Sequence, residues 1–446
     1  MRPAGDYGGA VGEVVLSPTA SIAATAGGFA LRDGALHCEG VPLERIAAAV
    51  DTPTYVYSTA AIRDQYRLLD DAFSALPHRL HYSVKANSSL AVLALLRELG
   101  AGLDIVSGGE LYRARLAGFA GADVVFSGVG KTARELDDAL AAGVLFVNVE
   151  SEGELVLLDE VARRRGVVAP VALRVNPEVA VDTPHAYTRT GGRGHKFGIP
   201  FEDAPAAAQL ARSLPGLRLV GLDMHIGSQI AQFEPYGAAI DRVLALRERL
   251  RAKGHAEIRY LDIGGGLSVP YEDETPADVG RYASGVTALV RGTGLELILE
   301  PGRFLVANAG VLLTRVLYRK RSGGKEYVIT DAGMNDLVRP SHYQAFHHVD
   351  AVTPSGRRAV ADVVGPVCES GDFFALDRPM DDARPGDLLA IRSAGAYGFV
   401  MASNYNSRPR AAEVLVNGDR YAVVTERESY EDLVRRERAS PTWSTD

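Results

Sequence analysis

The chain has 446 residues, of which 47% are hydrophobic and 23% charged, and its formal net charge at pH 7 is −8. The length predicts two domains, and the composition is that of an ordinary globular protein, which excludes a disordered or fibrous chain. The acidic balance argues against nucleic acid or an anionic membrane surface as a main partner, because both favour basic patches. We therefore expect small-molecule ligands.

The two cysteines, Cys38 and Cys368, cannot form a disulfide framework. This usage predicts a reducing compartment, the cytoplasm. The first 30 residues interrupt their apolar positions with Asp6, Glu13 and hydroxyl side chains. We therefore expect neither a signal peptide nor a membrane span.

In chain order, the first elements are short β runs at 29–32 and 35–38, which bracket the turn Asp33-Gly34. From about residue 80 to residue 303, β-like runs then alternate eight times with amphipathic helical stretches. The expected strands end near Lys85, Val106, Ser127, Val149, Val175, His225, Ile263 and Glu300. Eight βα units predict a (β/α)8 TIM barrel over residues 51–310. A doubly wound sheet is the alternative, but it needs fewer strands and a nucleotide fingerprint that this sequence lacks.

After residue 310 the pattern changes to short β runs without long helices between them, separated by turns such as Asn417-Gly418. This predicts a C-terminal β domain over residues 311–446. The strands within residues 1–50 have the same character. We expect them to join this β domain, so that the barrel is inserted between its two parts.

The ends of the expected barrel strands are polar or glycine-rich, and active sites of barrels form at that face. Lys85 stands at the first strand end, where it could carry pyridoxal phosphate through a Schiff base; the alternative is a solvated surface charge. The run 264–266 is three glycines after the seventh strand, and Glu300-Pro301-Gly302-Arg303 ends the eighth. Loops after these two strands commonly bind phosphate, although a triple glycine can also be a simple tight turn.

Two further strand-end residues suit the same cofactor. Glu300 could face the pyridine nitrogen and keep it protonated, or it could be a glutamate at a helix N-terminus. His225 offers a flat imidazole, with Ser228 as a hydroxyl donor, although a buried structural histidine is equally compatible with the sequence. In the β domain, Arg339 and Tyr343 suit a substrate carboxylate, and Cys368-Glu369 reads as an accessible loop.

Taken together, these residues resemble a known family. The segments that carry the resemblance are Tyr82–Asn87, His195–Ile199, His225–Gln229, Glu300–Arg303, Asp331–Asp336, Cys368–Asp372 and Ala396–Gly398. They occur in the order found in the diaminopimelate decarboxylase family of fold-type III pyridoxal-phosphate enzymes, from about residue 52 to residue 416. The element Cys-Glu-Ser-Gly-Asp is the most specific of them.

The resemblance implies an alanine racemase-like fold, a barrel with a β domain, and pyridoxal 5′-phosphate as cofactor with no metal. It implies that Lys85 forms the Schiff base, that His225 stacks on the ring and that Glu300 meets the ring nitrogen. The other implied cofactor residues are Ser228, Gly265, Gly302, Arg303 and Tyr397. The implied substrate residues are Arg303, Arg339, Tyr343, Glu369 and Tyr397. Cys368 would be the proton donor, placed in the active site of the neighbouring subunit of a head-to-tail homodimer.

The implied reaction is the decarboxylation of meso-2,6-diaminopimelate to L-lysine and CO2, the last step of lysine biosynthesis. Two alternatives remain: a related decarboxylase acting on D-lysine or D-ornithine, and a catalytically silent regulatory homologue, against which the intact Lys85 and Cys368 argue. Two places depart from the family pattern. One is the order of residues 182–187, in an expected lid from Asp182 to His195, and the other is Asp223-Met224 before His225.

Overall fold

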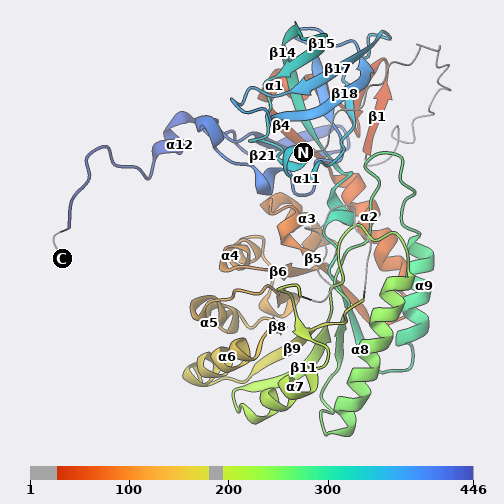
Figure 1. The fold of residues 1–446 in the computed structure, drawn as a ribbon, viewed down its shortest axis with the longest axis vertical. Helices are drawn as coiled ribbons and strands as arrows, with labels where there is room; N and C mark the ends of the chain where they lie inside the picture. The colour runs from red at the N-terminus through yellow and green to blue at the C-terminus, as the bar shows by residue number, and fades with distance from the viewer. Residues whose placement is uncertain (1–27, 180–193, 445–446) are drawn as a thin grey trace, which may run out of the picture.

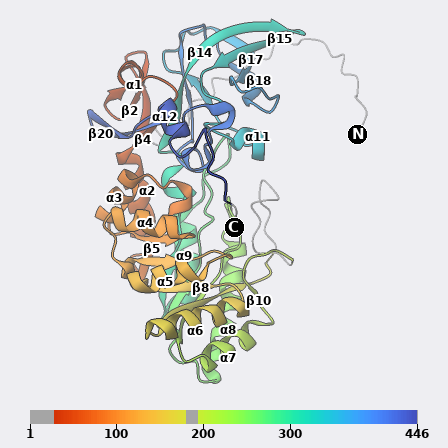
Figure 2. The same cartoon turned by 90° about the vertical axis from the view of Figure 1, so that its left-hand side faces the viewer.

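The computed structural model describes residues 28–179 and 194–444. A barrel and a β domain make up the molecule and lie one above the other in both views (Figures 1 and 2). The variant order at 182–187 lies outside the described residues, as does the expected lid except for Gly194 and His195. Among the described helices, none has both the length and the apolar character needed to cross a membrane.

Eight parallel strands close into the barrel, in the order in which they follow along the chain. They are β5 (His78–Ser83), β6 (Gly102–Ile105), β7 (Val124–Phe126), β8 (Phe146–Val149), β9 (Ala169–Asn176), β11 (Leu217–Asp223), β12 (Tyr260–Asp262) and β13 (Glu296–Leu299). β13 pairs with β5 and completes the ring, while the short β10 (Ile199–Pro200) pairs only with β9. The expected TIM barrel is confirmed.

Helices surround the strands on the outside of the barrel (Figure 1). They are α2 (Thr59–Ala72), α3 (Leu90–Glu98), α4 (Gly108–Leu116), α5 (Ala133–Ala142), α6 (Glu152–Arg165), α7 (Ala204–Ser213), α8 (Glu234–Ala252) and α9 (Val279–Val290). α6 illustrates how the sequence specifies them: Ser151 caps its start, Gly166 ends it in a left-handed conformation, and Leu155 and Leu158 are buried. Its apolar positions recur at helical spacing, so one face packs on the strands.

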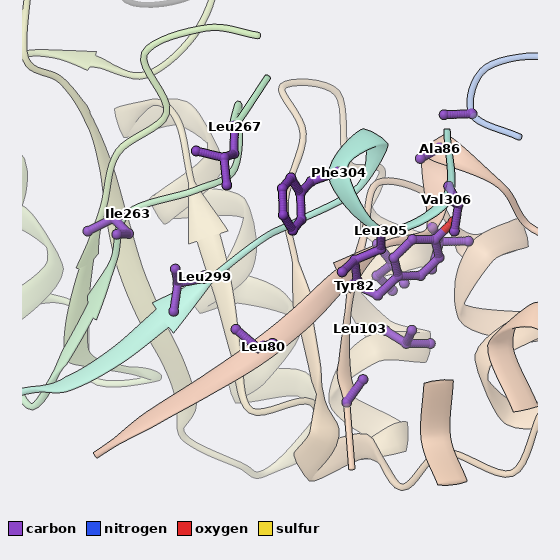
Figure 3. Close-up of a cluster of buried hydrophobic side chains, with 14 of the residues drawn as sticks. Leu80, Tyr82, Ala86, Leu103, Ile263, Leu267, Leu299, Phe304, Leu305 and Val306 are labelled. Atoms are coloured by element: carbon purple, nitrogen blue, oxygen red, sulfur yellow. The ribbon is translucent and has the colours of Figure 1, made fainter. Parts of the chain in front are cut away.

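One cluster of buried apolar side chains is contributed by the barrel strands themselves, with Phe146 of β8, Tyr260 of β12 and Ile298 of β13 among its members. A larger core lies between the strands and the helices. Figure 3 draws part of that core, with Leu80 and Leu299 on the neighbouring strands β5 and β13 and Leu305 on the short α10 (Arg303–Val306). This packing fixes the turn from β13 into α10, which carries several of the expected site residues.

The β domain is built on a sheet with the order β18-β17-β15-β14-β4-β20-β21. The strands are β4 (Thr54–Ser58), β14 (Gly310–Ser322), β15 (Lys325–Thr330), β17 (Arg358–Val364), β18 (Phe373–Asp381), β20 (Ala412–Asn417) and β21 (Arg420–Thr425), with β16 (Val349–Ala351) and β19 (Leu388–Ile391) attached through β14. β4 runs antiparallel to β14 and parallel to β20. This sheet therefore contains a strand from within residues 51–310, the range expected for the barrel domain.

The N-terminal strands belong to the β domain by packing. β1 (Phe29–Arg32), β2 (Ala35–Cys38) and β3 (Val41–Pro42) form a small sheet of their own, followed by α1 (Leu43–Val50). Phe29, Leu36 and Cys38 share a buried cluster with Val56 of β4 and Val414 of β20. The short helix α11 (Arg339–Tyr343) also belongs to the domain, while α12 (Tyr430–Val434) lies on the C-terminal segment that projects from it (Figure 1). The boundaries at residues 50 and 310 stay a prediction.

Candidate active site

A cleft lies at the carboxyl ends of the barrel strands, where active sites of barrels form. Every residue that the sequence assigned to the cofactor lines this cleft. They are Lys85, His225, Ser228, Gly265, Glu300, Gly302, Arg303 and Tyr397. Residues from β5, β11, β12, β13 and the β domain thus meet at one place.

Lys85 lies in a single 3-10 turn, Val84–Ala86, that follows β5 directly. The strand itself ends at Ser83, two residues before Lys85, near which the sequence predicted its end. The turn aims the amine at Asp104 of β6, whose Oδ2 accepts hydrogen bonds from Lys85 Nζ at 2.7 Å and from Ser83 Oγ at 2.8 Å. Burial lowers the pKa of Lys85, but the charges of Asp104 and Glu300 outweigh it, and the pKa lies above its usual value. Lys85 is therefore held as an ammonium beside a buried carboxylate.

Glu300 is buried at the end of β13. Ser127 Oγ, from the far side of the barrel, donates to its Oε1 at 3.2 Å. Burial and the charge of Asp104 raise the pKa of Glu300 to about 7, against the opposing charges of Lys85 and Arg174. The side chain points across the barrel, which the helix-terminus alternative does not explain. A carboxyl that titrates near neutrality suits a position facing a protonated ring nitrogen.

Further buried acids lie beside Glu300. Carboxylate oxygens of Asp223, Asp262 and Glu300 lie within 4.8 Å of one another, and burial raises the pKa of both aspartates. Arg174 Nε is 3.8 Å from Asp223 Oδ2, and its Nη1 is 2.8 Å from Glu150 Oε1. Asp223, which departs from the family pattern, is thus paired with an arginine. That pairing and the raised pKa values suit shared protons better than a metal ion.

The turn after β12 closes over the cleft with no room for a side chain. A Cβ on Gly265 would lie 2.2 Å from the carbonyl oxygen of Glu300. The Gly265 N–H donates to His225 Nδ1 at 3.3 Å, so the proton of a neutral imidazole lies on Nε2. Burial, helped by the charge of Arg174, lowers the pKa of His225 to about 3, which keeps the ring neutral. A flat neutral ring beside a glycine turn fits a phosphorylated aromatic cofactor.

The expected substrate residues divide into two groups. Arg303 and Arg339 come together at the cleft, with the guanidinium of Arg303 4.9 Å from the Tyr397 ring and that of Arg339 5.8 Å from the Tyr343 ring. The Tyr397 N–H also donates to the carbonyl of Ala86 at 2.8 Å, which joins the β domain to the turn that carries Lys85.

Cys368 and Glu369 form the second group. Both are exposed in the loop between β17 and β18, and neither lines the cleft. The Cys368 N–H donates to Asn406 Oδ1 at 3.0 Å, and Glu369 raises the pKa of Tyr405 through a hydrogen bond and its charge. The structure thus presents Cys368 and Glu369 to the outside, away from Lys85.

The sequence did not single out four residues of the site. Asp104 was visible as a polar strand end but received no role, and Asp262 lies one residue before the expected end of its strand. Tyr271 and His347 gave no signal, because each lies in an irregular segment outside the helices and strands. Their contacts with Arg303 and Arg339 come only from the fold.

Comparison with known proteins agrees with this geometry. Residues 59–307 match the family model described as pyridoxal-dependent decarboxylase, pyridoxal binding domain. The diaminopimelate decarboxylase of Pseudomonas aeruginosa is 52% identical over 416 residues, which are 93% of this chain and 99% of the relative. That of Aquifex aeolicus is 47% identical, over 90% of this chain and 96% of the relative.

Solved structures give the same result. The crystal structure of diaminopimelate decarboxylase from Helicobacter pylori complexed with L-lysine is similar, with a TM-score of 0.86 and 41% identity over 89% of this chain and 99% of that one. The lysine/ornithine decarboxylase of Vibrio vulnificus, at 23% identity and a TM-score of 0.75, shares the fold. This chain belongs to the diaminopimelate decarboxylases, within the family of pyridoxal-dependent decarboxylases.

Proposed function

We propose that this protein catalyses the pyridoxal-phosphate-dependent decarboxylation of meso-2,6-diaminopimelate to L-lysine and CO2. One observation carries the proposal: Lys85 and the other expected cofactor residues line a single cleft, beside the buried cations Arg303 and Arg339. The names of the relatives, and the L-lysine in the Helicobacter pylori complex, support this substrate.

The residues of the cleft suit the cofactor. Lys85 would attach it, the backbone around Gly265 would receive its phosphate, and His225 would pack on its ring. When bound, pyridoxal phosphate supplies an electron sink for the pair left on Cα as CO2 departs. Glu300 would hold a proton at the ring nitrogen, which its pKa near neutrality allows.

The two arginines would recognise the second carboxylate of the substrate. Burying a carboxylate without a partner costs several kcal/mol, so a site for a substrate with a second carboxylate must supply cations. Arg303 and Arg339 would bind this carboxylate together with Tyr343. Tyr397, beside Arg303, would contact both cofactor and substrate.

We assign Cys368 as the donor of the proton that replaces CO2 on Cα, and Glu369 as the ligand of the distal ammonium. Because both are exposed and lie outside the cleft of their own chain, they would act in the cleft of a second copy. The active unit would then be a homodimer with shared sites. A cysteine used as a proton donor must stay reduced, which fits the cytoplasm.

Product identification tests the proposal. Purified protein with pyridoxal phosphate is incubated with meso-diaminopimelate, D-lysine or D-ornithine, with Lys85→Ala as the inactive control. We expect L-lysine and CO2 from diaminopimelate. Preferential turnover of D-lysine or D-ornithine would assign the protein to the related decarboxylases. No turnover of any of these amino acids would favour the catalytically silent regulatory homologue.

A further inference from the structure

Arg303 and Arg339 are two buried cations to which the described residues offer no anionic partner. Arg339 is 6% exposed, and Arg303 Nε is buried with no hydrogen-bond partner. Within the described chain neither forms an ion pair. Burial acts on the pKa of both groups, and the charged neighbours that act on them are tyrosines and, for Arg339, Arg303. Two like charges this close repel each other, so other groups must hold the two guanidinium groups in place.

Tyr271 lies between the two guanidinium groups. Its hydroxyl accepts a hydrogen bond from Arg303 Nη1 at 2.6 Å, and its ring lies 5.0 Å from the guanidinium of Arg339. Tyr271 is 6% exposed, and its N–H donates to Glu274 Oε2 at 2.8 Å, which anchors the loop after β12. One side chain therefore contacts both arginines, one through its oxygen and the other through its ring face.

His347 holds the second arginine. Its Nδ1 is 2.7 Å from the carbonyl oxygen of Arg392, so the ring proton must lie on Nδ1. Nε2 is then an acceptor, and Arg339 Nε donates to it at 3.4 Å. The imidazole meets the Tyr271 ring edge-on, with centroids 5.4 Å apart and planes at 80°. Burial and the charge of Arg339 lower the pKa of His347 to about 3, so the acceptor persists at neutral pH.

We propose that Tyr271 and His347 are positioning residues that hold Arg303 and Arg339 as a paired carboxylate site and thereby set the preference for a substrate that keeps a second carboxylate. The inference rests on the proposed function and deepens it. Tyr271 fixes Arg303 and separates the two charges, while His347 fixes Arg339. Because the described residues supply no carboxylate to the two arginines, a carboxylate of the ligand would be their negatively charged partner.

The experiment compares two ligands that differ by that carboxylate. L-lysine carries it, and cadaverine is L-lysine without it. Their affinities for the full-length holoenzyme are measured by titration calorimetry, for wild type, Tyr271→Phe, His347→Phe and His347→Gln. Tyr66→Phe is the matched control, because Tyr66 is buried in α2 and lies outside the cleft.

Tyr271→Phe keeps the ring and removes the acceptor for a charged donor. We expect L-lysine to bind about tenfold to a hundredfold more weakly, with cadaverine unchanged and KM for diaminopimelate raised more than kcat is lowered. His347→Phe should act in the same direction, and His347→Gln should restore part of the loss, since its amide oxygen can replace Nε2. Tyr66→Phe should leave the ratio of affinities at the wild-type value.

The proposal would be overturned if the variants lost affinity for both ligands equally or for neither. It would also be overturned if the wild-type enzyme bound L-lysine no better than cadaverine. Thermal melts identify a variant that fails to fold. If a variant at one of the two positions, Tyr271 or His347, does not fold, the affinities of the variant at the other position test the proposal. A wild-type enzyme that discriminates the two ligands but does not turn over diaminopimelate would refute the proposed function and leave this inference standing.

Discussion

Lys85 and Lys131 are both ion-paired with buried carboxylates, but their surroundings differ. The amine of Lys85 meets a fully buried aspartate, Asp104, while its side chain stays 40% exposed toward the cleft. Lys131 is also ion-paired, but its side chain is only 1% exposed and it donates to two carbonyls and Glu154. The first lysine can meet a ligand, and the second is part of the packing.

Reduction with borohydride should therefore fix the cofactor on Lys85. Protein loaded with pyridoxal phosphate is reduced, digested and mapped by mass spectrometry, with Lys85→Ala in parallel. We expect one adduct, on the peptide that contains Lys85, because a Schiff base needs an accessible amine. An adduct on Lys131 or any other lysine in place of Lys85 would refute the assignment.

Arg339→Ala should lower kcat/KM for meso-diaminopimelate at least about a hundredfold, because a desolvated charge pair is worth about 3 kcal/mol or more. Cofactor absorbance should not change. Arg212→Ala, on the outer surface of α7, is the control. Steady-state kinetics on diaminopimelate and D-lysine give the measurement, and equal losses on both would mean that Arg339 does not read the distal carboxylate.

Asp336 makes the stability of the fold depend on pH. Burial raises its pKa to about 7 in the folded protein, from an ordinary 3.8, against the Gly333 N–H that donates to it. The folded state thus binds more protons between these values, and this contribution to stability is lost as pH rises from about 4 to about 7, at roughly 1.4 kcal/mol per pKa unit. The free energy of unfolding of Asp336→Asn should therefore fall less than that of the wild type as pH rises through this window.

Thermal melts of the wild type and the variants at about pH 3, pH 5 and pH 8 measure the difference. Asp382→Asn is the contrasting control, because a hydrogen bond from Arg319 lowers the pKa of Asp382. Its variant should lose stability relative to wild type as pH rises through the acid range. The same sign for both variants would contradict the assigned pKa directions.

Residues at strand ends could be predicted from the sequence, and residues in irregular loops could not. Lys85, His225 and Glu300 each follow a recognisable β run, and parallel strands bring their ends together whatever the details of packing. Tyr271 and His347 lie in loops of different domains, 76 residues apart by their numbers. Only the tertiary fold brings their rings to 5.4 Å.

At the level of elements, the turn after β12 is the most constrained part of the site. Gly265 has no space for a Cβ, which would meet the Glu300 carbonyl at 2.2 Å. Gly265→Ala must displace either this turn or the end of β13. We expect a loss of about 1–3 kcal/mol of stability, as for other overpacked sites, together with weaker cofactor binding.

Gly153→Ala is the matched control, because a Cβ at this position in α6 would meet nothing within 4 Å. Alanine favours helix, so this variant should keep or slightly gain stability. Thermal melts and cofactor titration distinguish the two. Wild-type cofactor affinity in Gly265→Ala would show that the turn does not hold the phosphate.

The carboxyl ends of the barrel strands could be predicted to within about two residues because each is a short apolar run between helices. The assignment of β4 could not. Thr54–Ser58 is buried along its whole length, like a barrel strand, and its partners β14 and β20 lie far along the chain. Periodicity reports which residues are buried, but it does not report which sheet buries them.

For the whole molecule, the position of Cys368 outside the cleft of its own chain leads to a mixing experiment. Lys85→Ala and Cys368→Ala are each expected to be inactive. Combined under conditions of subunit exchange, they should form hybrid dimers with one intact site and recover up to about a quarter of wild-type activity if exchange is random. Lys85→Ala mixed with itself is the control, and no recovery after verified exchange would exclude a shared site.

The pairing of β4 also has a consequence for how the chain folds. β4 is made early by the ribosome, but its neighbours in the sheet begin at residues 310 and 412. All strands of the barrel lie between, so the barrel can close while β4 still lacks both neighbours. Contacts this far apart in sequence form slowly. We expect newly made chains to pass through a stage with a formed barrel and an unpaired, apolar β4, which is the point at which chaperones would matter most.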